Sequence, residues 1–142
     1  MTYTGQCACG AVTATIEGEP FAVRQCWCRQ CQQLAGGSAS TNVMFAAEAI
    51  ALTGALSAHH YIAASGNTIS HGFCPKCGTP VWGQSSARPQ FRALRVGFLD
   101  AGHGLRPQMA IWLDDAPDWA VIDPALEQHR RQPPPPAALN PS

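Results

Sequence analysis

The sequence predicts a mainly β domain of short strands, and three observations support this. Several stretches of about five residues alternate apolar and polar side chains or are rich in β-branched and aromatic residues. No stretch longer than about ten residues has a convincing helical period of 3.6. With 142 residues, 46% of them hydrophobic and 13% charged, the chain has the composition of a folded domain with a core.

In chain order, the first strand is expected over residues 12–16, where apolar and polar positions alternate before Gly18 and Pro20. A short helical turn is expected over residues 29–36, because the pair Gly36-Gly37 would stop it. Residues 64–67, Ala-Ser-Gly-Asn, have the composition of a hairpin loop. Further strands are expected over residues 41–45, 49–53, 59–63, 68–73, 91–99 and 109–113.

We expect one zinc-binding domain over residues 1–125 and a proline-rich tail over residues 126–142. The four consecutive prolines, Pro133–Pro136, cannot donate to a helix or a sheet ladder. The tail is therefore expected to be an extended polyproline-like segment or disordered.

The charge pattern argues against two classes of partner. Nine basic residues balance nine acidic ones with no basic stripe, so nucleic acid is not an expected partner. No apolar run is long enough to cross a bilayer, so no membrane partner is expected. The N-terminus lacks the basic and apolar regions of a secretory signal, which favours a cytoplasmic location. Nothing in the sequence indicates an oligomeric state.

Seven cysteines indicate metal binding, because an odd number of thiols in a reducing compartment argues against a disulfide framework. Cys74 and Cys77 form a two-residue chelate followed by Gly78. Cys7 and Cys9 are followed by glycine in the same way, and in a strand both sulfurs would face one side. Zinc prefers four such ligands in a tetrahedron. The four are therefore expected to hold one structural zinc: Cys7, Cys9, Cys74 and Cys77.

The middle cluster supplies three more thiols within one short segment: Cys26, Cys28 and Cys31. Three protein ligands with one vacant position are typical of a catalytic zinc. Two alternatives remain at this point. A histidine, from His59, His60, His71 and His103, could close a second structural site. Cys28-x-x-Cys31 could also be a redox pair, although no βαβ pattern surrounds it.

The three blocks resemble the glutathione-dependent formaldehyde-activating enzyme family, which shares a domain with centromere protein V. The resemblance rests on Cys-x-Cys-Gly, Cys-x-Cys-x-x-Cys and Phe-Cys-x-x-Cys-Gly-Thr, in that order. It continues through Arg95-Val-Gly97 and Trp119, so it spans residues 3–122. This chain departs from the family at Trp27, where histidine is common, and at Gln108 and Met109, where histidine is often seen.

The resemblance implies an Mss4-like fold of small coiled antiparallel β-sheets stapled by two zinc ions. It also implies a structural zinc on the first and last blocks and a catalytic zinc on the middle block. The implied reaction is a carbon–sulfur lyase type of condensation between formaldehyde and glutathione. The competing function is a non-catalytic Mss4-like module, with two structural zincs, that recruits a protein partner.

If the middle zinc is open, it can bind an incoming thiol and favour the thiolate, which is the nucleophile. Arg24 and Arg29 are candidate clamps for the carboxylates of glutathione, with ordinary surface charge as the alternative. His71 is a candidate general base or a hydrogen-bonded strand histidine. The four tryptophans are expected in the core rather than at a substrate: Trp27, Trp82, Trp112 and Trp119.

Overall fold

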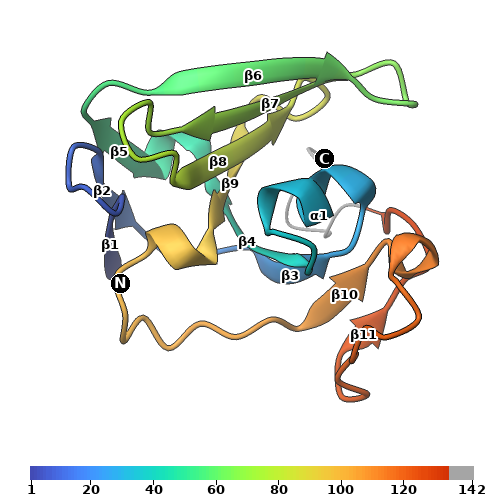
Figure 1. Cartoon of the computed structure of the whole chain (residues 1–142). Helices are drawn as coiled ribbons and strands as arrows, with labels where there is room; N and C mark the ends of the chain where they lie inside the picture. The colour runs from blue at the N-terminus through green and yellow to red at the C-terminus, as the bar shows by residue number, and fades with distance from the viewer. Residues whose placement is uncertain (135–142) are drawn as a thin grey trace. The chain divides into compact units, whose positions relative to one another are not determined.

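The computed structural model describes residues 1–134, which fold mainly as β-strands with one six-residue α-helix (Figure 1). This confirms the predicted fold class. The chain divides into two units, and each is built from two separate segments. Unit 1 comprises Met1–Pro20 and Met44–His103, and unit 2 comprises Phe21–Val43 and Gly104–Ser142. Strand β4 (Ser40–Ala46) carries the chain from unit 2 into unit 1.

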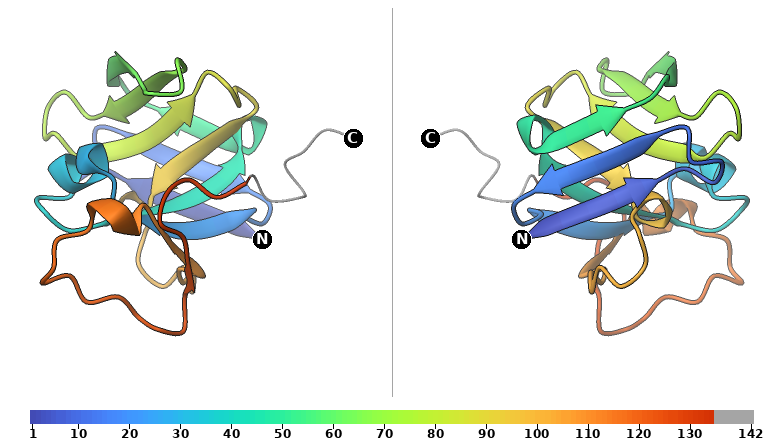
Figure 2. Two further views of the ribbon diagram at one scale, coloured as in Figure 1. Left: turned by 90° about the vertical axis from the view of Figure 1, so that its right-hand side faces the viewer. Right: turned by 90° about the vertical axis from the view of Figure 1, so that its left-hand side faces the viewer.

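Unit 1 contains a three-stranded antiparallel sheet in the order β1-β2-β5. Its strands are β1 (Thr2–Gln6), β2 (Thr13–Glu17) and β5 (Ile50–Thr53), the last preceded by the 3-10 helix η1 (Ala47–Ala49). Figure 2 shows β1 and β2 side by side. Every second residue of both strands is buried, as the alternation over residues 12–16 predicted. Strand β1 was not predicted, because its Gly5 and Gln6 weaken the strand pattern.

The other strands of unit 1 form an antiparallel meander in chain order. They are β6 (Ser57–Ile62), β7 (Thr68–Phe73), β8 (Pro80–Ser85) and β9 (Phe91–Arg95). The predicted hairpin is confirmed, with the Gly66 N–H donating to the carbonyl of Ala63 in its loop. The strand predicted over residues 91–99 was wrong beyond Arg95, because a 3-10 helix, η2 (Val96–Phe98), follows.

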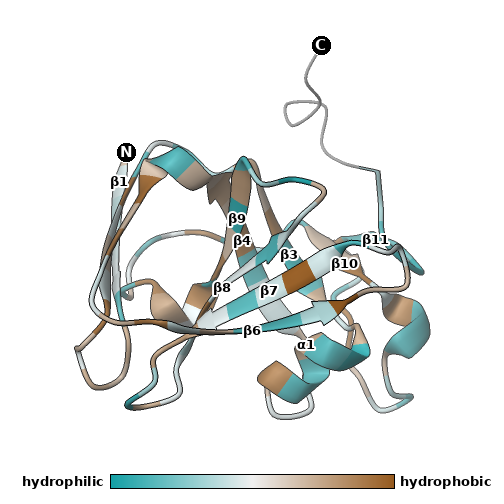
Figure 3. Ribbon diagram, turned by 90° about the horizontal axis from the view of Figure 1, so that it is seen from above, coloured by the Kyte–Doolittle hydropathy of each residue, from teal (hydrophilic) through white to brown (hydrophobic). Residues whose placement is uncertain are grey.

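Unit 2 places β10 (Met109–Ile111) between β3 (Ala22–Cys26) and β11 (Glu127–Gln128), with parallel pairing on both sides. Helix α1 (Arg29–Leu34) confirms the predicted helical turn, and its ribbon is largely hydrophilic in Figure 3. The predicted strand over residues 109–113 ends at Ile111. Trp112 has left-handed backbone angles and begins the 3-10 helix η3 (Leu113–Asp115) instead.

Strand β11 lies within the range expected to be the tail. The segment after it stays close to η3, since the Leu113 and Asp114 N–H groups donate to the carbonyls of His129 and Arg130. The proposed boundary at residue 125 stays a prediction. The polyproline prediction for Pro133–Pro136 falls in part on residues 135–142, which lie outside the described residues.

Candidate metal centres

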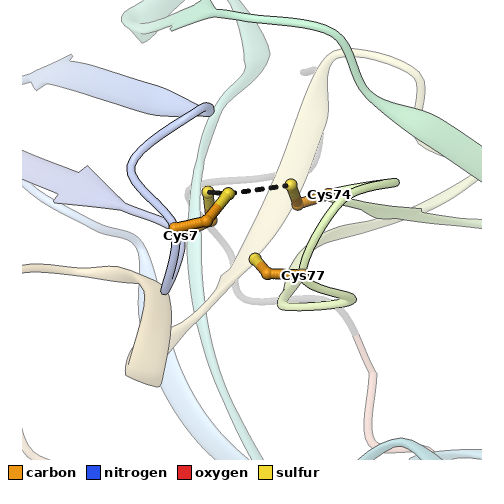
Figure 4. A group of neighbouring side chains, drawn as sticks. Cys7, Cys74 and Cys77 are labelled. Atoms are coloured by element: carbon orange, nitrogen blue, oxygen red, sulfur yellow. Dashed lines mark hydrogen bonds between the residues drawn. The ribbon is translucent and has the colours of Figure 1, made fainter.

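Two turns of unit 1 bring four cysteine sulfurs together. Cys7 and Cys9 lie in the turn after β1, and Cys74 and Cys77 lie in the turn between β7 and β8. All four Sγ atoms lie within 4.8 Å of one another. Figure 4 shows the side chains of Cys7, Cys74 and Cys77 pointing toward one another. The grouping is the one that the spacing of the cysteines predicted.

Both turns owe their shape to a glycine placed after a cysteine. The Gly10 N–H donates to the Cys7 carbonyl at 3.0 Å, and the Gly78 N–H donates to the Cys74 carbonyl at 2.8 Å. Both glycines have positive φ angles, 79° and 76°, which side chains disfavour. The strand geometry expected for Cys7 and Cys9 was wrong, because a hydrogen-bonded turn follows β1 and aims both sulfurs instead.

The spacing of the sulfurs fits a tetrahedral zinc. Two Sγ–Sγ distances are given by the structure, 3.7 Å between Cys7 and Cys9 and 3.8 Å between Cys9 and Cys74. A tetrahedron with metal–sulfur bonds of ~2.3 Å has edges of ~3.8 Å. The Val12 N–H also donates to the Cys7 Sγ at 3.2 Å, as expected for a sulfur that carries negative charge. The four-sulfur cluster can therefore hold a metal ion.

Hydrogen bonds around this cluster favour the ionised form of one ligand. Donation from the Thr79 hydroxyl, at 3.1 Å, and from the Thr79 N–H lowers the pKa of Cys77 to about 5. Thr79 also accepts from the Ala8 N–H at 3.1 Å, so one side chain links the two cysteine turns. Since the thiolate is the form that binds zinc, these contacts favour Cys77 as a metal ligand.

The second cluster lies in unit 2, where β3 leads into α1. Cys26 ends β3, Cys28 is the N-cap residue of α1, and Cys31 lies in the first turn of the helix. The Cys31 N–H donates to the Cys28 Sγ at 3.4 Å. All three sulfurs lie within 4.8 Å of one another, with Cys26 and Cys31 buried and Cys28 partly exposed. The short helix thus folds one continuous segment into a three-thiol cluster.

Three crowded thiols cannot all ionise without a cation. Hydrogen bonds with Cys28 and Cys31, together with burial, raise the pKa of the Cys26 thiol far above its usual range. A metal ion among the sulfurs would reverse this, because a coordinated thiol loses its proton. The donor set is therefore one that zinc or another soft metal fits.

No fourth histidine, cysteine, aspartate or glutamate of residues 1–134 joins this three-thiol cluster. The histidines considered as a closing ligand belong to unit 1. There, His60 and His71 have other partners: His60 Nδ1 lies 2.7 Å from the Ser70 hydroxyl, and His71 Nδ1 lies 2.6 Å from an Arg95 guanidinium nitrogen. Within residues 1–134, the cluster thus consists of three sulfurs and no fourth ligand-type side chain.

A buried glutamine fixes the loop that carries the three thiols. Gln32 donates its amide N–H groups to the carbonyl of Trp27, at 2.7 Å, and to that of Asp115, at 2.9 Å. Ile111 is buried with Cys26 and Cys31, and three partly buried side chains pack against that group: Cys28, Met109 and Trp112. Sequence analysis did not single out Gln32 or Ile111, because their contacts depend on β10 pairing beside β3.

The remaining candidates have mixed outcomes. Arg24 is buried at 7% exposure, whereas Arg29 is exposed and donates to Gln32 Oε1 at 3.4 Å. Trp27 and Trp82 are buried, as predicted. The core prediction for Trp119 was wrong, because this side chain is 66% exposed. Trp112 is only partly buried, against the three-thiol cluster.

Fold and site together define a mainly β protein with two cysteine clusters that can each hold a metal ion. The chain belongs to the glutathione-dependent formaldehyde-activating enzyme family, whose sequence model matches residues 2–115. A crystal structure of a Rhodobacter sphaeroides protein resembles it with a TM-score of 0.57 and 24% identity, over 73% of this chain and 91% of that one. This likeness supports the fold alone. No curated protein matches the sequence. No described helix is long and apolar enough to span a membrane.

Proposed function

We propose that this protein is a zinc-dependent enzyme of the carbon–sulfur lyase type that joins a thiol such as glutathione to a small aldehyde such as formaldehyde. Family membership suggests this class of activity. The single observation that carries the proposal is the cluster of Cys26, Cys28 and Cys31, which no fourth ligand-type residue of the described chain completes. The four-cysteine cluster of unit 1 would hold a structural zinc: Cys7, Cys9, Cys74 and Cys77.

The two clusters are proposed to differ because their donor sets differ. Four thiolates satisfy the tetrahedral preference of zinc, and such sites stabilise the fold. Three thiolates leave one position for a ligand from solution. A zinc ion held there would lower the pKa of a thiol that approaches it, and a soft ion prefers sulfur to carbonyl oxygen. Cys28, the least buried of the three, is the cysteine through which this position would open toward solvent.

The proposed reaction forms one carbon–sulfur bond. The sulfur of the ionised thiol attacks the carbonyl carbon, and the carbonyl π electrons move to the oxygen. That oxygen takes up a proton, so a thiol and an aldehyde give an S-hydroxyalkyl thioether with no change in overall redox state. The thiol's own proton balances the one gained, and the step requires no oxidant.

Arg29 is the better placed of the two candidate clamps for the carboxylates of glutathione. It is exposed and begins α1, directly after Cys28. An arginine guanidinium can bind a carboxylate through two parallel hydrogen bonds. Arg24 is buried, so a carboxylate would reach it only if the residues that cover it moved. Cysteine thiols can bind a metal only while they remain reduced. Reducing conditions are those of the cytoplasm, which supports a cytoplasmic location.

The test is the rate at which ¹³C-formaldehyde exchanges with its glutathione adduct at equilibrium, followed by NMR exchange spectroscopy. The condensation also proceeds without an enzyme, so the rate must rise in proportion to zinc-loaded protein. Cys28→Ser should return the rate to background, whereas Gln33→Ala, an exposed change on α1, should not. A zinc-loaded wild-type protein that leaves the rate at background contradicts the proposal.

A second candidate function is a zinc-stabilised module that recruits a protein partner. Two apolar side chains of unit 2 favour it, since Trp119 is 66% exposed and Val121 is 91% exposed. Exposed aromatic residues are enriched in protein interfaces. A protein that holds two zinc ions, binds no thiol and does not accelerate the exchange would support this function over catalysis.

A further inference from the structure

Trp112 has a backbone conformation that a bulky residue rarely adopts. Its φ and ψ angles are 59° and 39°, and no other non-glycine residue of the described chain has a positive φ. Left-handed geometry brings the Cβ atom close to the following carbonyl oxygen, so side chains are disfavoured there. Such an outlier persists where the surrounding structure imposes it, and it occurs often at functional sites.

Residues that follow β11 hold Trp112 in place. Its indole Nε1–H donates to the Gln132 side-chain oxygen at 3.1 Å. Its backbone N–H donates to the Arg131 carbonyl at 3.4 Å, and the next N–H, of Leu113, donates to the His129 carbonyl at 3.1 Å. These partners lie beyond residues 2–115, the part of the chain that matches the family. This chain therefore uses residues outside the family match to fix the ring.

The Trp112 side chain packs against a buried group that contains two of the three thiols. Trp112, Met109 and Cys28 are the partly buried side chains packed on Cys26, Cys31 and Ile111. Because Gln132 already accepts the indole N–H, the ring offers only carbon surface to a molecule that approaches the sulfurs. Met109 packs a polarisable, apolar thioether against the same buried group. Trp112 and Met109 thus both place apolar surface against the buried group that contains two of the three thiols.

We propose that Trp112 determines specificity at this cluster, by favouring thiols that carry an apolar group next to the sulfur. The inference rests on the proposed function, because it requires a thiol to bind beside Cys26, Cys28 and Cys31. The indole would cover part of the ligand's carbon surface. Removing that apolar surface from water favours binding. The proposed substrates are thiols whose sulfur is attached to an apolar group.

The experiment compares two uncharged thiols, benzyl mercaptan and 2-mercaptoethanol, on cobalt-substituted protein, by titration of its visible absorption. Wild type should bind benzyl mercaptan more tightly by about tenfold or more, because the ring covers its phenyl group. Trp112→Gly keeps the left-handed backbone without strain and removes the ring, so the ratio of the two Kd values should fall to within about threefold of unity. Trp112→Phe should retain most of the preference.

Trp119→Ala is the matched control, since it removes an exposed tryptophan of the same unit and should leave the ratio unchanged. If Trp112→Gly does not fold, Trp112→Asn replaces it, because asparagine tolerates left-handed geometry. A wild-type ratio near one, or a ratio that persists in whichever of Trp112→Gly and Trp112→Asn folds, overturns the role of Trp112 and leaves the proposed open site standing. A wild-type spectrum that neither thiol alters overturns the proposed function, and this inference with it.

Discussion

At the scale of single residues, a few buried polar contacts hold the segments that carry the thiols. The cysteines could be grouped from sequence, because a chelate needs only short spacing and a glycine to leave the turn. Gln32 could not be singled out in this way. Its two carbonyl partners, on Trp27 and Asp115, are separated by most of the chain, and no local pattern records that they meet.

Gln32→Met should lower the free energy of unfolding by about 1–3 kcal/mol, because the buried bond to the Trp27 carbonyl and the partly buried bond to the Asp115 carbonyl are both lost. Methionine keeps the length of the side chain but has no N–H group. Gln33→Met is the matched control, since Gln33 is the exposed neighbour on α1 and should change stability little. Chemical denaturation with the metal bound measures the free energy of unfolding of both variants. Equal loss in the two variants would show that Gln32 does not hold the cysteine loop.

At the scale of elements, the sequence predicted the strands with regular alternation and missed those interrupted by other residues. Strand β8 begins with Pro80 and contains Gly83, and β3 contains Arg24 and Gln25, so neither has a strong strand pattern. Strand β7 was predicted, but its packing contact with the neighbouring strand β8 was not. The indole of Trp82, on β8, covers Gly72 of β7, its cross-strand partner.

Gly72→Ala should destabilise this pair of strands and thereby the turn that carries Cys74 and Cys77. A Cβ atom at Gly72 would lie 2.1 Å from Trp82 Nε1, so the ring would have to move. That ring is buried and also lies under the Arg92 guanidinium, 4.3 Å from its centroid. Overpacking of this kind costs about 1–3 kcal/mol.

Gly97→Ala is the control for this prediction, because a Cβ there meets no atom within 4 Å. Thermal denaturation should show a lower Tm for Gly72→Ala alone. If both variants melt at the wild-type temperature, Trp82 does not pack on Gly72 as described.

At the scale of the whole molecule, the alternation of apolar and polar residues predicted a mainly β fold, and the spacing of the cysteines predicted two groups of thiols. They could not predict that the chain folds as two units, each assembled from two distant segments. Nor could they predict the parallel pairing of Ile111 with Cys26, which brings β10 beside the three-thiol cluster. Such pairings depend on long-range contacts, whereas chelates and turns are local.

The central claim is that the cluster of Cys26, Cys28 and Cys31 presents a metal ion with one position open to a thiol. Titration of cobalt-substituted protein with glutathione, followed by visible absorption, tests it most directly. Glutathione should change the spectrum, and S-methylglutathione, whose sulfur cannot ionise, should bind far more weakly. Cys28→Ser should abolish this difference while the four-cysteine cluster maintains the fold. An unchanged spectrum at saturating glutathione would contradict the claim and leave the protein with the family's fold alone.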